Sequence, residues 1–185
     1  MNTLIFFGSP RKNGHTHQML EVLAEHLEGN VEIIDAYRTK NVSPCMDCRH
    51  CWKVNKCAIQ DGMQEIFEKV EAADTIVIAT PMYFHSIPGP LKILLDRLQL
   101  YWSGHVVRKD LPIESFRTGA LLMTGGAPAF DGQFDAGEFV LNGILQDLNA
   151  ECAGVVSMPN TDHDSLETRP DLKEQILALA EQLNR

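Results

Sequence analysis

The chain has 185 residues, 44% of them hydrophobic and 22% charged, which is enough for one globular domain with a full core and unlike a disordered protein. Its formal net charge of −9 argues against a nucleic-acid partner, because contacts to phosphate groups need basic patches. The N-terminal apolar run is too short for a signal peptide, and no apolar stretch approaches the ~18 residues of a membrane span. We therefore expect a cytoplasmic protein, in a reducing compartment where structural disulfides are rare.

Apolar runs alternate with amphipathic segments along the whole chain. The runs are continuous, as in strands buried on both faces, and they predict strands at 3–8, 31–37, 75–80, 119–126 and 153–159. Apolar residues at helical spacing predict helices at about 16–27, from Asp61, from Pro90, at about 136–149 and from about Pro170. Asp61 is expected to be the N-cap of its helix, with Gln64 completing a capping box.

Five strands that alternate with five helices predict an α/β fold, in which a parallel sheet has helices on both faces and right-handed crossovers. The chain shows no internal repeat, low-complexity tract or linker, so we expect residues 1–185 to form a single domain. In such sheets, ligands bind beyond the C-terminal ends of the strands. The loops that follow the first, third and fourth strands are therefore the expected site.

The first of these loops, GSPRKNGHT (8–16), combines hydroxyls, a cationic Arg11 and a helix that starts directly behind it. Backbone N–H groups and the positive end of the helix favour an anion at this position. The loop is not a Walker A motif, because five residues separate Gly8 from Gly14 and His15 replaces the lysine. It predicts a cradle for a terminal phosphate; the alternative is an ordinary strand–helix turn.

The other two loops offer different chemistry. TPMYFHSIPG (80–89) places two aromatic rings and a thioether after a buried strand, where they can grip a flat ring or simply pack on the next helix. The glycines of TGG (124–126) allow the backbone to approach a ligand closely. Phosphate, ring and close backbone contacts at one sheet edge together favour a flat mononucleotide as the ligand.

GSPRKNGHT, ATPMYFHSIPGPLKILLDR (79–97) and ALLMTGG (120–126) together resemble the NADPH-dependent FMN reductase branch of the flavodoxin-like superfamily. The segment PCMDCRHCWKVNKC (44–57) is similar to the iron–sulfur flavoproteins of that branch. The resemblance implies a flavodoxin-like three-layer sandwich with strand order 2-1-3-4-5, bound FMN and NAD(P)H as electron donor. By matched position it assigns the FMN phosphate to Ser9, Arg11, Asn13, Gly14 and Thr16. It assigns the border of the isoalloxazine ring to Pro81, Met82, Tyr83, Phe84, Thr124, Gly125 and Gly126.

Four of the five cysteines lie in an insert at about 43–58, with the spacing C-x2-C-x2-C-x5-C. Two-residue gaps are typical of ferredoxin-like [4Fe–4S] ligands, whereas zinc sites more often consist of two separated C-x-x-C pairs. The resemblance favours the cluster; zinc and free or redox-active thiols are the alternatives. The expected ligands are Cys45, Cys48, Cys51 and Cys57. Cys152 opens a strand and is expected to be a core thiol.

Three functions follow from these expectations. The first is an electron-transfer flavoprotein with FMN and a [4Fe–4S] cluster, which passes electrons to a redox partner or a small acceptor. The second is a cluster-free NAD(P)H-dependent FMN or quinone reductase, and the third is a non-enzymatic module in which zinc stabilises the cysteine loop. The resemblance implies a homodimer or homotetramer, and the segment LYWSGHVV (100–107) is the expected interface because it presents aromatic residues after a helix.

Overall fold

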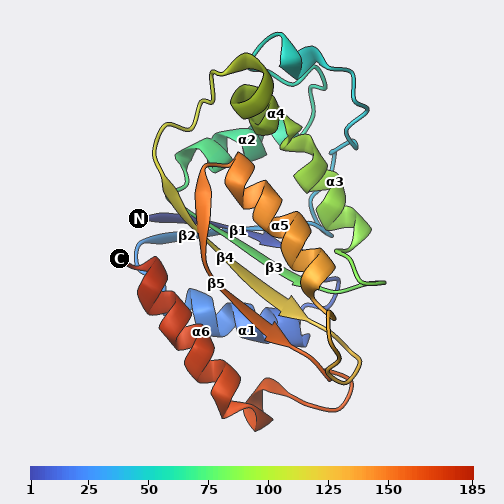
Figure 1. Cartoon of the computed structure of the whole chain (residues 1–185), viewed down its shortest axis with the longest axis vertical. Helices are drawn as coiled ribbons and strands as arrows, with labels where there is room; N and C mark the ends of the chain where they lie inside the picture. Colours follow the sequence, from blue (N-terminus) through green and yellow to red (C-terminus); the bar gives the residue numbers. More distant parts are fainter.

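In the computed structural model, which describes residues 1–185, five parallel strands form one sheet in the order β2-β1-β3-β4-β5 (Figure 1). The strands are β1 (Asn2–Phe7), β2 (Asn30–Asp35), β3 (Thr75–Pro81), β4 (Arg117–Thr124) and β5 (Ala150–Met158). The predicted α/β class and the flavodoxin-like strand order are confirmed. Each strand overlaps the apolar run that predicted it. The central strands β1, β3 and β4 are covered on both faces and need apolar side chains throughout, whereas the edge strands β2 and β5 are only partly buried.

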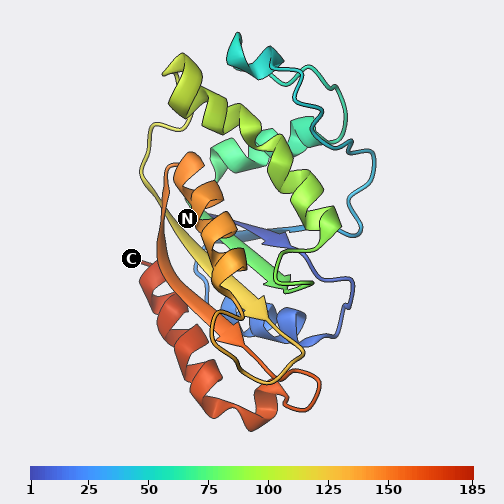
Figure 2. The same cartoon turned by 45° about the vertical axis from the view of Figure 1, so that its right-hand side comes forward.

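Helices cover both faces of the sheet (Figures 1 and 2). The α-helices are α1 (His15–Ala24), α2 (Met63–Ala72), α3 (Gly89–Arg97), α4 (Gln99–Trp102), α5 (Asp135–Asp147) and α6 (Pro170–Leu183). Short helical segments are η1 (His50–Trp52), the π-helix η2 (Ser103–Arg108) and η3 (Leu166–Thr168). The apolar sides of α1 and α6 pack with one face of the sheet, and those of α2, α3 and α5 pack with the other. No helix combines the length and the apolar character that crossing a membrane requires.

The start of α2 differs from the prediction. The N-cap residue is Gly62, and Asp61 precedes it, although the Asp61 carboxylate still accepts the Met63 N–H at 3.0 Å. The Gln64 side chain donates to the Ile59 carbonyl at 2.9 Å instead of returning to Asp61. The predicted capping box is therefore wrong, because the carboxylate of Asp61 is shared with a second chain segment, described below.

The segment after α3 also differs from the prediction. Leu100 and Tyr101 are buried in the core, and the Tyr101 hydroxyl donates to the Phe67 carbonyl at 3.2 Å. Only Val106 and Val107 are exposed apolar residues of this segment. The expectation that 100–107 presents its aromatic residues as an interface is wrong for Tyr101, because helical spacing turns this ring toward α2.

Candidate functional site

A cavity of about 120 Å³ lies at the C-terminal edge of the sheet, between the strand ends and the first turn of α1. The predicted residues that line it are Ser9, Arg11, Gly14, Thr16, Pro81, Met82, Tyr83, Thr124 and Gly126. Asn13, Phe84 and Gly125 do not line it. The structure thus brings together three loops that are far apart in the sequence, because parallel strands end at the same edge.

The first turn of α1 forms one wall of this strand-end cavity. Gly14 is the N-cap of α1 and no side chain caps the helix, so this end offers N–H groups to a ligand. The Thr16 hydroxyl lies 2.7 Å from that of Thr124, which joins the first loop to the end of β4. His15 also lines the cavity, and its Nδ1 atom is buried without a hydrogen-bond partner. Together these donors make the wall suitable for an anion.

Gly8 allows the first loop to leave the sheet at this point. Its N–H donates to the Ala79 carbonyl at 2.8 Å, so the loop begins in contact with the end of β3. A Cβ atom at Gly8 would lie 2.6 Å from Leu91 Cδ2 and 2.9 Å from Thr80 Oγ1. Only glycine permits this approach of the loop to α3 and β3.

The loop after β3 makes a tight turn in which Tyr83 and Ser86 exchange backbone hydrogen bonds of 2.7 and 3.0 Å. The two central residues, Phe84 and His85, have φ angles of 49° and 60°, in the left-handed region that glycine usually occupies. For side chains of this size the conformation costs about 1–2 kcal/mol per residue. Strain of this kind gathers at functional sites. The turn leaves Tyr83 half exposed beside the cavity and Phe84 fully exposed to solvent, so Phe84 does not line the cavity.

Two further lining residues, Thr161 and Asp162, come from the loop after β5. The Thr161 N–H donates to the Gly125 carbonyl at 3.0 Å, and this contact places the loop over the end of β4. A Cβ atom at Gly126 would lie 2.9 Å from a carboxylate oxygen of Asp162. This loop was not among the predicted site loops. Its position directly after the last apolar strand, at the same edge of the sheet, was the signal that could have found it.

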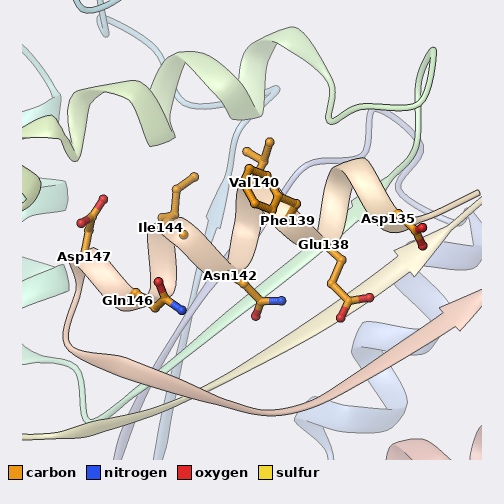
Figure 3. Close-up of a pocket in the computed structure, with 9 residues that line it drawn as sticks. Asp135, Glu138, Phe139, Val140, Asn142, Ile144, Gln146 and Asp147 are labelled. Carbon is orange, nitrogen blue, oxygen red and sulfur yellow. The ribbon is translucent and has the colours of Figure 1, made fainter. Parts of the chain in front are cut away.

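A larger groove of about 690 Å³ runs along the outer side of α5 (Figure 3). Its lining includes the carboxylates of Asp135, Glu138 and Asp147. Burial raises the pKa of Asp147, and nearby His105 only partly offsets this. This groove has three acidic side chains and no arginine or lysine, so it does not suit a phosphate; the strand-end cavity has one, Asp162, but also Arg11 and the start of α1, and it remains the candidate site.

The predicted cysteine ligands lie together at a second place, beside the C-terminal end of α3. Cys45, Cys48, Cys51 and Cys57 all border one cavity of about 20 Å³, with mainly apolar walls. None of them forms a disulfide, and Cys45 and Cys48 are exposed. No group of three or more His, Cys, Asp and Glu side chains is arranged to hold a metal ion. The four thiols therefore surround one space without converging on one point.

The cysteine segment rests on the elements that follow α3. Cys51 Sγ lies 3.3 Å from the Ser103 hydroxyl, and Arg108 donates to the Cys51 carbonyl. The Trp52 and Trp102 rings pack with centroids 6.1 Å apart. The π-helix thus supports this segment, in keeping with the frequent occurrence of π-helical turns at functional sites.

Cys152 is separate from the other four cysteines. It lies in β5, is partly buried against the core, and its Sγ donates to the Gly154 carbonyl at 3.4 Å. Burial raises the pKa of this thiol. It does not border the cavity of the other four cysteines, which agrees with the structural role expected for it.

Comparison with known proteins connects these features to a family. Residues 1–129 match a family described as NADPH-dependent FMN reductase. An iron–sulfur flavoprotein of Methanosarcina thermophila is 34% identical over 122 residues, which cover 65% of this chain and 61% of that protein. An iron–sulfur flavoprotein of Archaeoglobus fulgidus is 27% identical over 184 residues, which cover 96% of this chain and 91% of that protein. The chain matches 61%, 58% and 48% of the length of the first three curated relatives.

A solved structure shares the fold over the whole chain. The NAD(P)H:quinone oxidoreductase from Methanothermobacter marburgensis superposes with a TM-score of 0.75 at 19% identity. The superposition covers 100% of this chain and 96% of that one. At this level of identity the likeness establishes the fold alone.

Proposed function

The chain belongs to the NADPH-dependent FMN reductase family, and on this basis we propose that it is an FMN-dependent oxidoreductase whose cysteine segment holds a [4Fe–4S] cluster. NAD(P)H is the proposed hydride donor. A redox partner or a small molecule is the proposed acceptor. The observation that carries the proposal is the strand-end cavity, where anion donors and an aromatic residue meet at one edge of the sheet.

The residues of the first loop fit the phosphate of FMN. The uncapped first turn of α1, the buried and unpartnered Nδ1 of His15 and the hydroxyls of Ser9 and Thr16 all border the same space. Arg11 supplies the positive charge, and its backbone N–H donates to Ser9 Oγ at 3.3 Å. A cavity of about 120 Å³ suits the phosphate end alone, because whole ligands of this size occupy roughly 300–1,000 Å³.

The ring of FMN is assigned to the surface next to this cavity. Tyr83 is half exposed there and offers a flat face, and Met82 offers a polarisable thioether. Gly126 adds no side chain, so the backbone at the end of β4 is open to close approach. The roles of Asn13, Phe84 and Gly125, which do not line the cavity, stay predictions from the family resemblance.

The cysteine segment fits an iron–sulfur cluster in its donor chemistry. Four free thiols border one space, and its other walls combine apolar side chains with the charged or polar Asp47, Arg49, Arg97 and Gln99. Thiolates are the usual ligands of such clusters. The two exposed thiols, Cys45 and Cys48, lie in a segment without helix or strand, which lets this side of the space adjust to its occupant.

Bound FMN would supply both two-electron and one-electron redox chemistry, and a cluster held by the cysteines would supply one-electron transfer. The chain's residues bind and orient these groups. The first loop fixes the phosphate, the 83–86 turn positions Tyr83, and Thr161 holds the last loop over β4. The nine-residue α3 begins three residues after the 83–86 turn and ends beside the cysteines, so one helix connects the two places.

The experiment is purification without air, followed by quantitation of FMN, iron, sulfide and zinc. Full FMN with about four iron and four sulfide per chain supports the proposal. Cys48→Ser is expected to lose iron while FMN stays bound, and Cys152→Ser, the matched control, is expected to keep both. Oxidation of NADPH with quinone as acceptor then tests the reductase activity.

Two other outcomes decide between the alternatives. FMN without iron, together with quinone reduction, would assign the cluster-free reductase. Stoichiometric zinc without FMN would assign the zinc-stabilised binding module. Either result would contradict the proposed cluster.

A further inference from the structure

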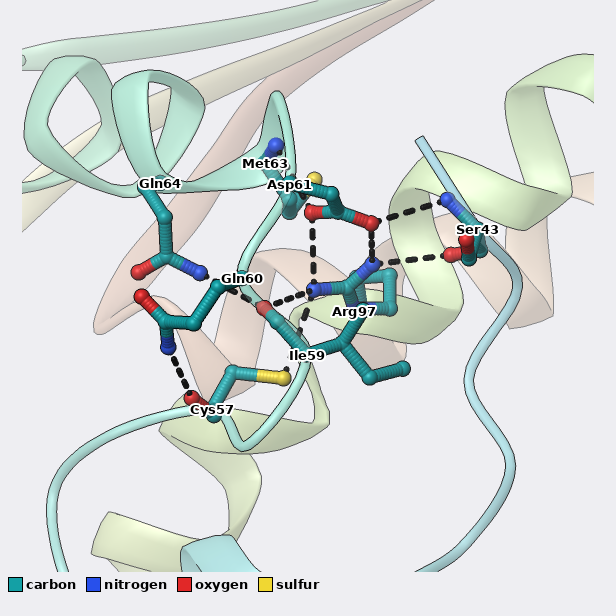
Figure 4. A network of polar contacts seen from close by, with 8 residues as sticks. All are labelled: Ser43, Cys57, Ile59, Gln60, Asp61, Met63, Gln64 and Arg97. Carbon is teal, nitrogen blue, oxygen red and sulfur yellow. Dashed lines mark hydrogen bonds and ion pairs between the residues drawn. The ribbon is translucent and has the colours of Figure 1, made fainter. Parts of the chain in front are cut away.

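The side chain of Arg97 lies at the end of α3 and is fully buried against the cysteine segment (Figure 4). It forms a two-pronged ion pair with Asp61, with N–O distances of 2.7 and 3.2 Å. It also donates to the carbonyls of Ser43 and Ile59, at 2.8 and 3.3 Å, which lie on either side of the cysteines. One guanidinium thus connects the two ends of the cysteine segment to each other and to α3.

The same guanidinium contacts a predicted ligand. Its Nη2 donates to Cys57 Sγ at 3.3 Å, and Arg97 borders the cavity that the four cysteines share. Its Nε is buried and has no hydrogen-bond partner, although every other donor nitrogen of the group is engaged. A buried cation is costly unless its donors are used, and one of the acceptors that Nη1 and Nη2 use is the Cys57 sulfur.

We propose that Arg97 is a positioning residue for the cluster, which holds Cys57 in place and donates a hydrogen bond to its sulfur that raises the cluster's reduction potential. The inference rests on the cluster of the proposed function. One-electron reduction adds one negative charge, part of which lies on the cysteine sulfurs, while no bond forms or breaks. A charged N–H donor stabilises the reduced form more than the oxidised form, and hydrogen bonds to the sulfurs are among the features that set cluster potentials.

Ser103, which contacts another of the predicted cysteine ligands, can be compared with Arg97. Its hydroxyl lies 3.3 Å from Cys51 Sγ, but it already donates to the Gln99 carbonyl at 2.8 Å. A hydroxyl has a single hydrogen, so in this structure the Cys51 thiol is the donor and Ser103 the acceptor; as a cluster ligand Cys51 would be a thiolate without a hydrogen to donate. Because Ser103 is neutral, its removal should change the potential less than removal of the Arg97 cation.

The test compares Asp61→Asn with the double variant Asp61→Asn/Arg97→Gln, both as FMN-loaded protein purified without air. Asp61→Asn keeps the donor to Cys57 and removes the neutralising carboxylate. The double variant removes the donor without leaving a buried charge unpaired. The readout is the midpoint potential of the cluster, measured by spectroelectrochemistry, with the FMN potential in the same sample as internal reference and Ser103→Ala as control.

We expect the cluster potential of Asp61→Asn to equal or exceed that of the parent. The cluster potential of the double variant should be at least ~59 mV lower than that of Asp61→Asn, which is a tenfold change in the one-electron redox equilibrium. The FMN potential should stay unchanged. Equal cluster potentials in the two variants, with iron content intact, would overturn the inference and leave the proposed function standing. A parent protein that holds no cluster would overturn both.

If the double variant does not retain iron, Arg97→Lys replaces it. Lysine keeps the positive charge but has no planar fork to engage Asp61, Ser43 and Cys57 at once. Its cluster potential should lie below that of the parent. A value equal to that of the parent would show that the geometry of the guanidinium does not act on the cluster, and would overturn the inference.

Discussion

Arg11 is the one arginine or lysine that lines the strand-end cavity, and Thr16 is the buried hydroxyl at the start of α1. We predict that Arg11→Ala/Thr16→Ala weakens FMN binding about tenfold to a hundredfold, since a charge-assisted hydrogen bond contributes about 1.5–3 kcal/mol. Isothermal titration of flavin-free protein measures the change. Lys12→Ala is the matched control, because it removes a neighbouring exposed charge that does not line the cavity. Equal affinity in the folded double variant would place the phosphate elsewhere.

Tyr83 carries the second prediction at this scale. Its ring borders the cavity while the strained turn holds its backbone. Tyr83→Ala should raise the fluorescence of bound FMN and shift its absorbance, because a stacked aromatic ring quenches flavin emission. Tyr83→Phe keeps the ring and should leave both signals close to those of the parent. If Tyr83→Ala also leaves them unchanged while FMN stays bound, Tyr83 only packs against the protein.

At the scale of the elements, the C-terminal end of helix α2 depends on a residue of strand β4. Arg117, the first residue of β4, is buried and donates to the carbonyls of Val70 and Glu71 at 2.5 and 2.8 Å. These are carbonyls of the last helical turn, and the Val70 carbonyl also accepts the Ala73 N–H at 3.4 Å. Burial lowers the pKa of Arg117, and nearby acidic groups offset only part of that effect. Arg117 thus connects the C-terminal end of α2 to β4, and its burial there removes water from the guanidinium.

We predict that Arg117→Met lowers the free energy of unfolding by about 2–5 kcal/mol, because the Val70 and Glu71 carbonyls lose the hydrogen bonds from a buried guanidinium. Urea unfolding of the flavin-free protein measures this change. Arg38→Met is the control: Arg38 forms a partly exposed ion pair with Asp35, which is worth less than about 1 kcal/mol. Similar unfolding midpoints for the two variants would contradict a capping role for Arg117.

At the scale of the whole molecule, the Asp61–Arg97 pair connects α2, α3 and the cysteine segment, and it links stability to pH. Burial opposes ionisation of Asp61, but hydrogen bonds from Arg97 and from the Ser43 and Met63 N–H groups hold its pKa below the ordinary value of 3.8. A lowered pKa means that the unfolded chain takes up the proton first. The pair's stabilisation is therefore complete above about pH 4 and is lost as the pH falls through the lowered pKa.

We predict that Asp61→Asn lowers the stability of the cluster-free protein by ~3 kcal/mol at neutral pH, since it leaves a buried guanidinium without its counter-ion. A domain with the usual 5–15 kcal/mol remains folded after this loss. The difference between the variant and the parent should shrink as the pH falls below about 4. Urea titrations at a series of pH values measure it, and a difference that does not change with pH would contradict the linkage.

The family resemblance supplied the strand order, and the residue spacing supplied the grouping of four cysteines. The sequence by itself determined the alternation of strands and helices and the edge that carries the candidate site. These features follow from local periodicity and from the rule that parallel strands end together, neither of which needs side-chain contacts. The tertiary structure decided the rest: Arg97 reaches Cys57 across 40 residues, Asp162 enters the cavity, and Phe84 turns away from it. A periodic pattern shows that a residue is buried or exposed but not which residue it meets. That choice depends on how the helices and loops pack over the sheet, where burial forces each charge and each donor to find a partner.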